Sequence, residues 1–350
     1  MNYFEKIKTL PIKEQAIIMG IETSCDETAV AIVKNGREIL ADEIISSASE
    51  HAKFGGVVPE IASRGHTTAI LTATQNALKS ANLTMDDIDA IAVTEGAGLL
   101  GALLVGVSFA KSLAFSLGKP LVPVSHIRGH ISASYLADKQ LEPPFITILA
   151  SGGHTAIAVV KSYYDIEILG STIDDAVGEA FDKVARVLGL QYPGGPNVER
   201  LAKEGNDAIK LPKMLKNYKG GEYDFSYSGL KTAVINYVHT EEQKGRQYNK
   251  ADVANSFQHA AIDVLVEKAL KAVKKTGYKT ISVSGGVGAN GYLRDALTVM
   301  AKNKNIKLVL PEKRYCTDNG AMIAAEGYLQ YKKGNFAPLT LNAKAVLPLK

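Results

Sequence analysis

Short runs of β-branched and aliphatic residues alternate along the chain with longer stretches in which apolar residues recur every three or four positions. The runs 21–33 and 148–160 are each broken by a polar turn, which predicts a pair of strands in each run. The remaining pattern predicts helices over 59–81, 103–117, 125–136, 173–188, 250–275, 292–302 and 319–333, and strands over 88–94, 120–124, 279–283 and 307–310. The polar stretch 239–249 predicts an exposed loop. Strands that alternate with helices are typical of α/β domains.

The two strand–turn–strand runs are similar to each other in sequence. At a constant offset of 127 residues, Ser24 corresponds to Ser151 and Thr28 to Thr155, and the run 29–33 corresponds to 156–160. Each copy predicts a β-hairpin. We interpret the pair as two homologous lobes, each of which presents a polar turn to a shared cleft. Chance similarity between two hairpins is the alternative.

The length and composition agree with two lobes. A chain of 350 residues exceeds what one core normally serves, because cores stop growing at roughly 250–300 residues. With 46% hydrophobic and 22% charged residues, the composition excludes wholesale disorder. We therefore expect a folded protein with two cores.

Cysteine usage and the lack of long apolar stretches bear on location. Cys25 and Cys316 are too few for a disulfide framework or a zinc finger, and they favour a reducing cytoplasm. The first twenty residues carry scattered charges, unlike a signal peptide. The longest uncharged apolar stretch, 96–110, contains four glycines and is shorter than the ~18 residues of a membrane span. We therefore expect a cytoplasmic protein without a membrane partner.

The net charge of +4 is only a slight basic bias. One local cluster stands out, because four lysines and two tyrosines lie within fourteen residues. Lysines beside aromatic rings suit a phosphate backbone and a stacked base. A solvated charged face is the alternative. The cluster consists of Lys210, Lys213, Lys216, Tyr218, Lys219 and Tyr223.

Several glycine-rich turns of the chain are candidates for nucleotide or phosphate binding. The stretch 96–101 matches GxGxxG, but no acidic residue follows before Asp138, so the dinucleotide-binding interpretation fails and close packing is favoured. A P-loop is absent because Gly118-Lys119 is followed by Pro120. The turns at 151–153 and 284–290 both follow predicted strands, and their backbone amides suit a phosphate. A tight connection is the alternative for either turn alone.

Two histidines suggest a metal site. His126 and His130 are four residues apart in a predicted helix, so their imidazoles lie on one face and can share a metal ion. A protease of the HExxH type needs glutamate directly after the first histidine, where this chain has Ile127. Asp318, at the start of a later helix, is a candidate third ligand. The alternatives are histidines in a satisfied core and an aspartate that serves as a helix cap.

Taken together, nine stretches resemble the motif series of the tRNA N6-adenosine threonylcarbamoyltransferase family, the TsaD type. They occur in order and cover nearly all of residues 20–327. The matching stretches are GIETSCDETAVAIV at 20–33, FGGVVPEIASRGH at 54–66, GAGLLGALLVG at 96–106, PVSHIRGH at 123–130, SGGHT at 151–155, DDAVGEAFDKVARVLGLQYPGGP at 174–196, DFSYSGLKT at 224–232, SGGVGAN at 284–290 and CTDNGAMIA at 316–324.

The resemblance implies a duplicated actin-like, sugar-kinase-like (ASKHA) α/β fold with two lobes around a nucleotide cleft. We expect an extension over 1–18, an N-terminal lobe over 19–142, a C-terminal lobe over 143–325, and a final segment over 326–350 that packs back on the first lobe. The implied reaction moves a threonylcarbamoyl group from threonylcarbamoyl-AMP to N6 of adenosine 37, in tRNAs that read codons beginning with A.

The resemblance also assigns site residues by position. The family's metal ligands fall on His126, His130 and Asp318, with Fe²⁺ favoured over Zn²⁺ as the bound ion. No general base is evident, and only Asp26 and Glu27 in the first hairpin turn are candidates. The family's adenylate contacts fall on Ala150, Ser151, Gly152, Gly153, His154, Asp182, Gly195, Glu199 and Asn290.

The family further implies tRNA, an inactive paralogue of the same fold and a small P-loop ATPase as partners. Position 199 is glutamate where many relatives have aspartate, and Tyr227 stands where phenylalanine is common. Two other functions remain as alternatives. A small-molecule kinase of the same superfold would not need the histidine pair, and a nucleotide-gated scaffold would not need an intact ligand set.

Overall fold

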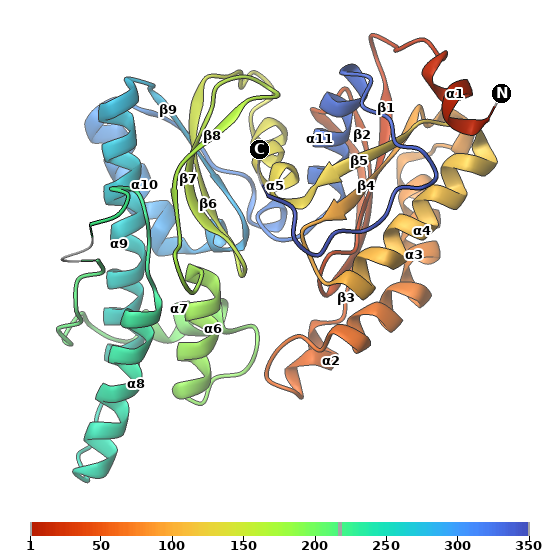
Figure 1. Ribbon diagram of the computed structural model, residues 1–350. Coiled ribbons are helices and arrows are strands. Elements are labelled where there is room, and N and C mark those ends of the chain that lie inside the picture. Colours follow the sequence, from red (N-terminus) through yellow and green to blue (C-terminus); the bar gives the residue numbers. More distant parts are fainter. Residues whose placement is uncertain (1, 216–218, 349–350) are drawn as a thin grey trace. The chain divides into compact units, whose positions relative to one another are not determined.

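The computed structural model describes residues 2–215 and 219–348, which form two compact units (Figure 1). The first unit contains Met1–Leu141 and Asp318–Lys350, and the second contains Glu142–Thr317. We had expected the boundaries after residues 142 and 325. The chain thus re-enters the first unit at Asp318, and its last helix belongs to that unit.

The first unit has a five-stranded sheet in the order β3-β2-β1-β4-β5. Its strands are β1 (Ile17–Glu22), β2 (Glu27–Lys34), β3 (Glu38–Ser46), β4 (Ala90–Gly96) and β5 (Leu121–Ser125). Its helices are α1 (Tyr3–Lys8), α2 (Ala48–Ala52), α3 (Pro59–Ala81), the 3-10 turn η1 (Met85–Asp87), α4 (Leu100–Leu117), α5 (His126–Ala137) and α11 (Gly320–Lys332).

The second unit has a five-stranded sheet in the order β10-β9-β6-β7-β8. Its strands are β6 (Phe145–Ala150), β7 (Thr155–Val160), β8 (Ile166–Ser171), β9 (Thr280–Ser284) and β10 (Lys307–Val309). Its helices are α6 (Val177–Val187), α7 (Gly194–Ala202), α8 (Ser228–Gln243), α9 (Lys250–Thr276), α10 (Gly291–Lys304), and the 3-10 turns η2 (Gly286–Ala289) and η3 (Lys313–Tyr315).

The duplication predicted from the sequence is confirmed by strand register. In the β1–β2 hairpin Ile21 pairs with Val30, and in the β6–β7 hairpin Ile148 pairs with Ile157, which is the same pair displaced by 127 residues. The first strand of each hairpin also pairs in parallel with a later strand, β4 or β9. Each unit therefore repeats one sheet topology, three antiparallel strands followed by two parallel ones.

Helix α11 lies in backbone contact with the sheet of the first unit. A Cβ atom at Gly20 would lie 2.4 Å from the Ala324 nitrogen, and one at Gly320 would lie 2.4 Å from the Ala31 nitrogen. Gly327 lies equally close to Ala92. Glycine is required at such positions because any side chain would hold the two backbones apart. This contact fixes the start of α11, and with it Asp318, against β1 and β2.

Most predicted elements are confirmed within a few residues, but two predictions are wrong. The predicted helix 173–188 begins only at Val177, because the Asp174 carboxylate accepts the Tyr227 N–H (2.8 Å) and shapes a turn. The predicted loop 239–249 is helical up to Gln243, the end of α8. Helix α7 was not predicted, because its opening residues Gly-Gly-Pro have low helix propensity.

Among the described residues, one helix, α4, has the length and apolar composition of a membrane span. Its inner face packs in the core of the first unit through Ala102, Leu103, Val107 and Ala110. The apolar residues on the inner face of α4 are therefore explained by its packing in the core. Its outer face bears Leu104, which is exposed.

We expect Gly20→Ala to lower the free energy of unfolding by about 3 kcal/mol, because the new methyl group would overlap backbone atoms that cannot rotate away. The midpoint of urea unfolding, followed by far-UV circular dichroism, measures the change. Gly65→Ala is the matched control. A Cβ atom at Gly65, on α3, would lie 4.0 Å from its nearest neighbour, so this variant should raise the free energy of unfolding by up to about 1 kcal/mol. Equal midpoints for Gly20→Ala and the unaltered protein would disprove the packing argument.

Candidate functional site

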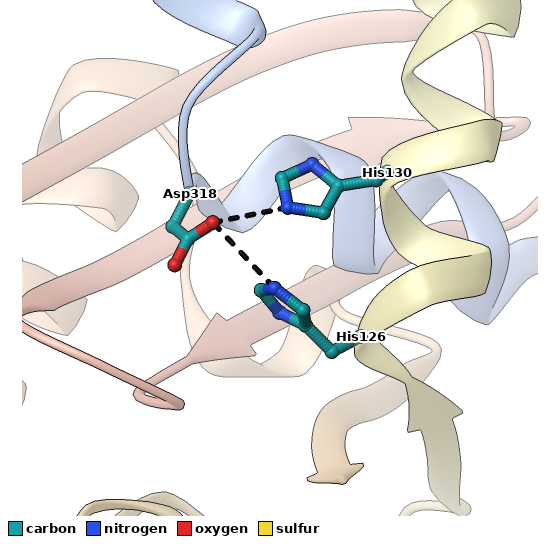
Figure 2. Close-up of side chains that lie close together, drawn as sticks. All are labelled: His126, His130 and Asp318. Carbon is teal, nitrogen blue, oxygen red and sulfur yellow. Dashed lines mark ion pairs between the residues drawn. The ribbon is translucent and has the colours of Figure 1, made fainter. Parts of the chain in front are cut away.

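Three side chains of the first unit converge on one point (Figure 2). His126 and His130 lie on the first two turns of α5, and Asp318 lies just before α11. The Asp318 Oδ1 atom is 3.1 Å from Nε2 of His130 and 3.6 Å from Nε2 of His126. One ligand atom from each residue lies within 4.8 Å of the others. Both imidazoles thus direct the same type of nitrogen toward a single carboxylate oxygen.

The burial of these histidines shows that they are not solvent-facing residues. His130 is 2% exposed, and neither of its ring nitrogens makes a hydrogen bond within the described part of the chain. Buried polar atoms are normally satisfied, so a buried imidazole that lies beside a carboxylate without a hydrogen bond indicates a missing partner. A cation between the two Nε2 atoms and Asp318 would satisfy this geometry. The alternative of a satisfied core histidine does not apply to His130.

The surroundings of His126 also favour positive charge. Its Nδ1 atom lies 3.1 Å from Oε2 of Glu22 and 3.1 Å from the hydroxyl of Ser24. Burial lowers the pKa of His126, but Asp318 and Glu22 outweigh this effect and raise the pKa to about 9. Two carboxylates thus attract a positive charge to this ring, whether it is a proton or a metal ion.

Asp318 is not the cap of α11. The cap is Asn319, whose side chain accepts the N–H of Met322 at 2.8 Å. Asn319 thus has the capping role that was the alternative interpretation of Asp318, and the Asp318 carboxylate faces the histidines (Figure 2).

A buried ion pair connects α5 to α11 beside the cluster. Glu326 on α11 accepts hydrogen bonds from Nε of Arg128 at 2.7 Å and from the hydroxyl of Ser132 at 2.6 Å, both on α5. Gln330 donates a third bond at 2.7 Å. Because Arg128 lies between the two histidines in sequence, this contact holds the histidine helix against the helix that follows Asp318.

The donor set fits a divalent transition metal. Two neutral imidazoles and one carboxylate are ligands for both iron(II) and zinc, and three protein ligands leave coordination positions for substrate atoms. Of the remaining candidate residues, Asp26 lies in the turn after β1 and Glu27 is the first residue of β2. Burial raises the pKa of Glu27 to about 9, with Asp318 and Asp26 adding to the shift. Asp26 is buried, and burial raises the pKa of the thiol of Cys25, the residue before it.

In the second unit, the glycine-rich turns lie beside each other. The strands β6 and β9 are parallel neighbours, with Leu149 opposite Ser284, so the turns that follow them meet at one edge of the sheet. A Cβ atom at Gly285 would lie 2.5 Å from the Ala150 carbonyl oxygen. Gly152 and Gly153, by contrast, have open space where a side chain would be. These two residues leave their backbone amides accessible to an anion.

The next adenylate candidates lie on two helices of the second unit, Asp182 on α6 and both Gly195 and Glu199 on α7. Gly178, at the start of α6, donates to the Ser151 carbonyl at 3.2 Å. Further along α6, Asp182 accepts the N–H of Gly194 at 2.7 Å, next to Gly195. Glu199 on α7 accepts the N–H of Gly291 at 3.1 Å.

Asn290 lies between η2 and α10. It caps α10 through the N–H of Leu293 and donates to Gln258 at 3.0 Å. His154, the last candidate, is half-buried behind the turn and donates its backbone N–H to the Ser151 hydroxyl at 3.1 Å. A cavity of about 440 Å³ opens beside Glu199 and Gly291.

The GxGxxG stretch has a packing role, as predicted. The Gly98 N–H donates to the Ala345 carbonyl of the C-terminal segment at 3.1 Å, and a Cβ at Gly96 would lie 2.3 Å from the Lys344 oxygen. These glycines let the C-terminal segment run along the ends of the strands, so no nucleotide role remains for them.

The lysine cluster is confirmed only as an exposed basic segment. Lys210, Lys213 and Lys219 are exposed, whereas Lys216 and Tyr218 lie outside the described residues. Tyr223 is 3% exposed, and the Lys275 Nζ atom lies 5.2 Å from its ring centroid, so its ring belongs to the core and not to the exposed basic segment.

Sequence reasoning missed two carboxylates that support the site, Glu22 and Glu326. Glu22 occurs within a run of otherwise apolar strand residues, and that interruption was the available signal. Glu326 lies in an apolar stretch of α11, which is the same signal. A charged residue in a buried apolar run is rarely retained without a specific partner.

Comparisons with known proteins agree with this arrangement. Residues 38–325 match the family described as TsaD, tRNA N6-adenosine threonylcarbamoyltransferase. Two proteins with that description are similar over almost their whole length. The protein from Clostridium botulinum (strain Kyoto / Type A2) is 52% identical over 97% of this chain and 99% of its own. The protein from Clostridium perfringens (strain SM101 / Type A) is 53% identical over 95% and 98%.

Among solved structures, full-length HypF in the phosphate- and nucleotide-bound form has a TM-score of 0.60 at 17% identity. The similarity covers 91% of this chain and 46% of HypF. This likeness shows the fold alone and confirms the predicted actin-like and kinase-like (ASKHA) class.

We expect Glu326→Ala to lower the free energy of unfolding by about 3 kcal/mol, because it removes the buried carboxylate that pairs with the largely buried Arg128 guanidinium. Urea unfolding measures the loss. The double variant Arg128→Met/Glu326→Leu removes both charges and should recover most of it. A double variant no more stable than Glu326→Ala would show that the ion pair is not the origin of the effect.

Proposed function

The chain belongs to the tRNA N6-adenosine threonylcarbamoyltransferase family, and we propose how its residues divide the work of this tRNA-modifying transferase. The main support for this proposal is that the side chains of His126, His130 and Asp318 converge on one point. We assign this cluster as a metal centre that holds one divalent ion, Fe²⁺ in preference to Zn²⁺. Such an ion would act as a Lewis acid on the carbonyl or phosphate oxygens of the donor.

The second unit is assigned the nucleotide part of the donor, threonylcarbamoyl-AMP. The accessible amides of Gly152 and Gly153 suit the phosphate, and Ala150 and His154 complete that turn. Asp182 and Glu199 each accept one backbone N–H and retain lone pairs for ribose hydroxyls.

The adenine of the donor is also assigned to the second unit. The adenine would lie near Asn290 and Gly195. The cavity of about 440 Å³ is lined by Glu199 and by Gly291, the residue after Asn290.

The reaction then needs few protein groups. The exocyclic N6 amine of adenosine 37 attacks the carbamoyl carbonyl, the bond from that carbon to the phosphate oxygen breaks, and AMP leaves with the electron pair. The amine must lose one proton in this step. The nearby carboxyl groups of Asp26 and Glu27 are the proposed acceptors. Burial and Asp318 raise the pKa of Glu27, so Glu27 accepts the proton only from its ionised form.

The distribution of charge supports tRNA binding by the second unit. That unit has 24 Lys and Arg against 19 Asp and Glu, whereas the first unit has 16 against 17. The small net charge of the chain is therefore the balance of a basic unit and a nearly neutral one. The exposed Lys210, Lys213 and Lys219 are the proposed contacts with the phosphate backbone.

Exposed apolar residues of the first unit support a protein partner. Leu71 on α3 and Leu100, Leu104 and Phe115 on α4 are exposed, and α3 packs against α4. An apolar surface on two adjacent helices fits a second helical pair. We assign it to the inactive paralogue of the same fold, with a small P-loop ATPase as the third component and the cytoplasm as the location.

We expect His126→Ala and Asp318→Ala to abolish formation of the modified nucleoside and to lower the bound metal below one ion per chain, with the fold retained. Purified protein is incubated with threonylcarbamoyl-AMP, unmodified tRNA and the partner proteins. Mass spectrometry of the digested tRNA and metal analysis are the readouts.

The matched control is His239→Ala, which removes an exposed histidine of α8. It should behave as the unaltered protein in both readouts. Full activity in both site variants would refute the metal assignment. Phosphorylation of a small molecule without any tRNA product would instead favour a kinase.

We expect Leu104→Glu to weaken binding of the partner paralogue at least tenfold without loss of stability, because residue 104 is already exposed. Isothermal titration calorimetry measures the affinity. Val299→Glu, an equally drastic change at an exposed position of α10, is the control. Unchanged affinity of Leu104→Glu would place the partner on another surface.

A further inference from the structure

Glu22 is a fully buried carboxylate at the end of β1, the central strand of the first sheet. Its Oε1 atom accepts the N–H of Ser24 at 2.5 Å, and its Oε2 atom accepts the hydroxyl of Thr94 at 2.7 Å. Oε2 also lies 3.1 Å from Nδ1 of His126. A buried carboxylate is costly unless every oxygen is paired, and here three donors converge on two oxygens.

We propose that Glu22 is a positioning residue of the metal centre, which holds the proton of His126 on Nδ1 and so keeps its Nε2 lone pair directed at the metal. The proposal rests on the assignment of His126, His130 and Asp318 as metal ligands. Glu22 itself does not reach the ligand cluster, because it contacts His126 from the opposite side of the ring.

The two nitrogens of His126 face different partners. Nε2 faces Oδ1 of Asp318 at 3.6 Å, and Nδ1 faces Glu22. A ligating imidazole must present a lone pair, so its proton has to reside on the other nitrogen. Ser24 also approaches Nδ1, but its hydroxyl both donates and accepts and cannot select a tautomer. The carboxylate only accepts and therefore can.

His130 offers the internal comparison. Its Nδ1 makes no hydrogen bond within the described residues, so nothing there selects its tautomer. Within the described structure, a protein group thus selects the tautomer of His126, whereas the tautomer of His130 would be set by the metal. A single anchored histidine is enough to define where the first ligand atom lies.

The anchor itself is rigid because it is built from strands. Glu22 pairs with Ala29 in the β1–β2 register, and Thr94 lies on the neighbouring strand β4. The Ser24 carbonyl accepts the N–H of Leu99 at 2.8 Å, and a Cβ at Gly98 would touch Ser24. Positioning groups on central strands are held more precisely than groups on loops.

Substitution by glutamine separates positioning from mere burial. The amide has the same shape but only one acceptor oxygen. If that oxygen faces His126, the NH₂ group opposes the Ser24 N–H. If it faces Ser24, the NH₂ group opposes Nδ1, which must then accept and which forces the proton onto Nε2. Either orientation loses the arrangement that the carboxylate provides.

The test compares Glu22→Gln with the unaltered protein, using Zn²⁺ as the probe. Affinity is measured by competition with a chromogenic chelator, and the protonated nitrogen of His126 is identified by ¹⁵N NMR of the zinc-loaded protein. We expect Glu22→Gln to bind Zn²⁺ about 10–100-fold more weakly. Ile21→Val, which removes one methylene from the same buried strand, is the matched control and should stay within threefold.

Two results would overturn the proposal. One is equal Zn²⁺ affinity of Glu22→Gln and the unaltered protein. The other is a zinc-loaded unaltered protein in which Nδ1 of His126 carries no proton, a measurement that does not depend on whether the variant folds. Failure of the metal centre itself would look different, since the unaltered protein would then bind no Zn²⁺ at all.

Discussion

The backbone contact between α11 and the β1–β2 hairpin is the constraint on which the site of the first unit depends. Gly20 and Gly320 let the helix approach the strands to a distance that no side chain would permit. Because Asp318 precedes this helix directly, its position is set by the sheet and not by a flexible loop. The ion pair of Glu326 with Arg128 then fixes the histidine helix to the same element.

A cluster assembled in this way has the electrostatics of a cation site. Asp318 and Glu22 lie on opposite sides of His126 and together overcome the effect of burial on its pKa. Burial and Asp318 raise the pKa of the neighbouring Glu27. A divalent ion would relieve these repulsions, since it adds positive charge where several carboxyl groups are close.

The two copies of the duplicated hairpin have diverged in chemistry while keeping their register. In the first unit Ser24 and Asp26 lie in the turn after β1 and Glu27 begins β2, so this hairpin carries side chains that interact with His126 and Asp318. In the second unit the equivalent turn contains Gly152 and Gly153, which leave their backbone amides open. One copy therefore suits a cation and the other an anion, although the same strands support both.

The sequence by itself determined the elements and the repeat, because helix and strand periodicity and a fixed offset of 127 residues are local properties of the chain. It also determined that His126 and His130 share a helical face, since their spacing alone decides this. Asp318 was a candidate ligand from its place before a helix and was assigned only through the family resemblance, whereas Glu22 and Glu326 were not identified at all. Their roles depend on contacts between segments far apart in the chain, which arise only when the helices pack against the sheet. The burial of Tyr223 beside an exposed lysine segment is likewise a property of the packed core, which its place in the sequence does not indicate.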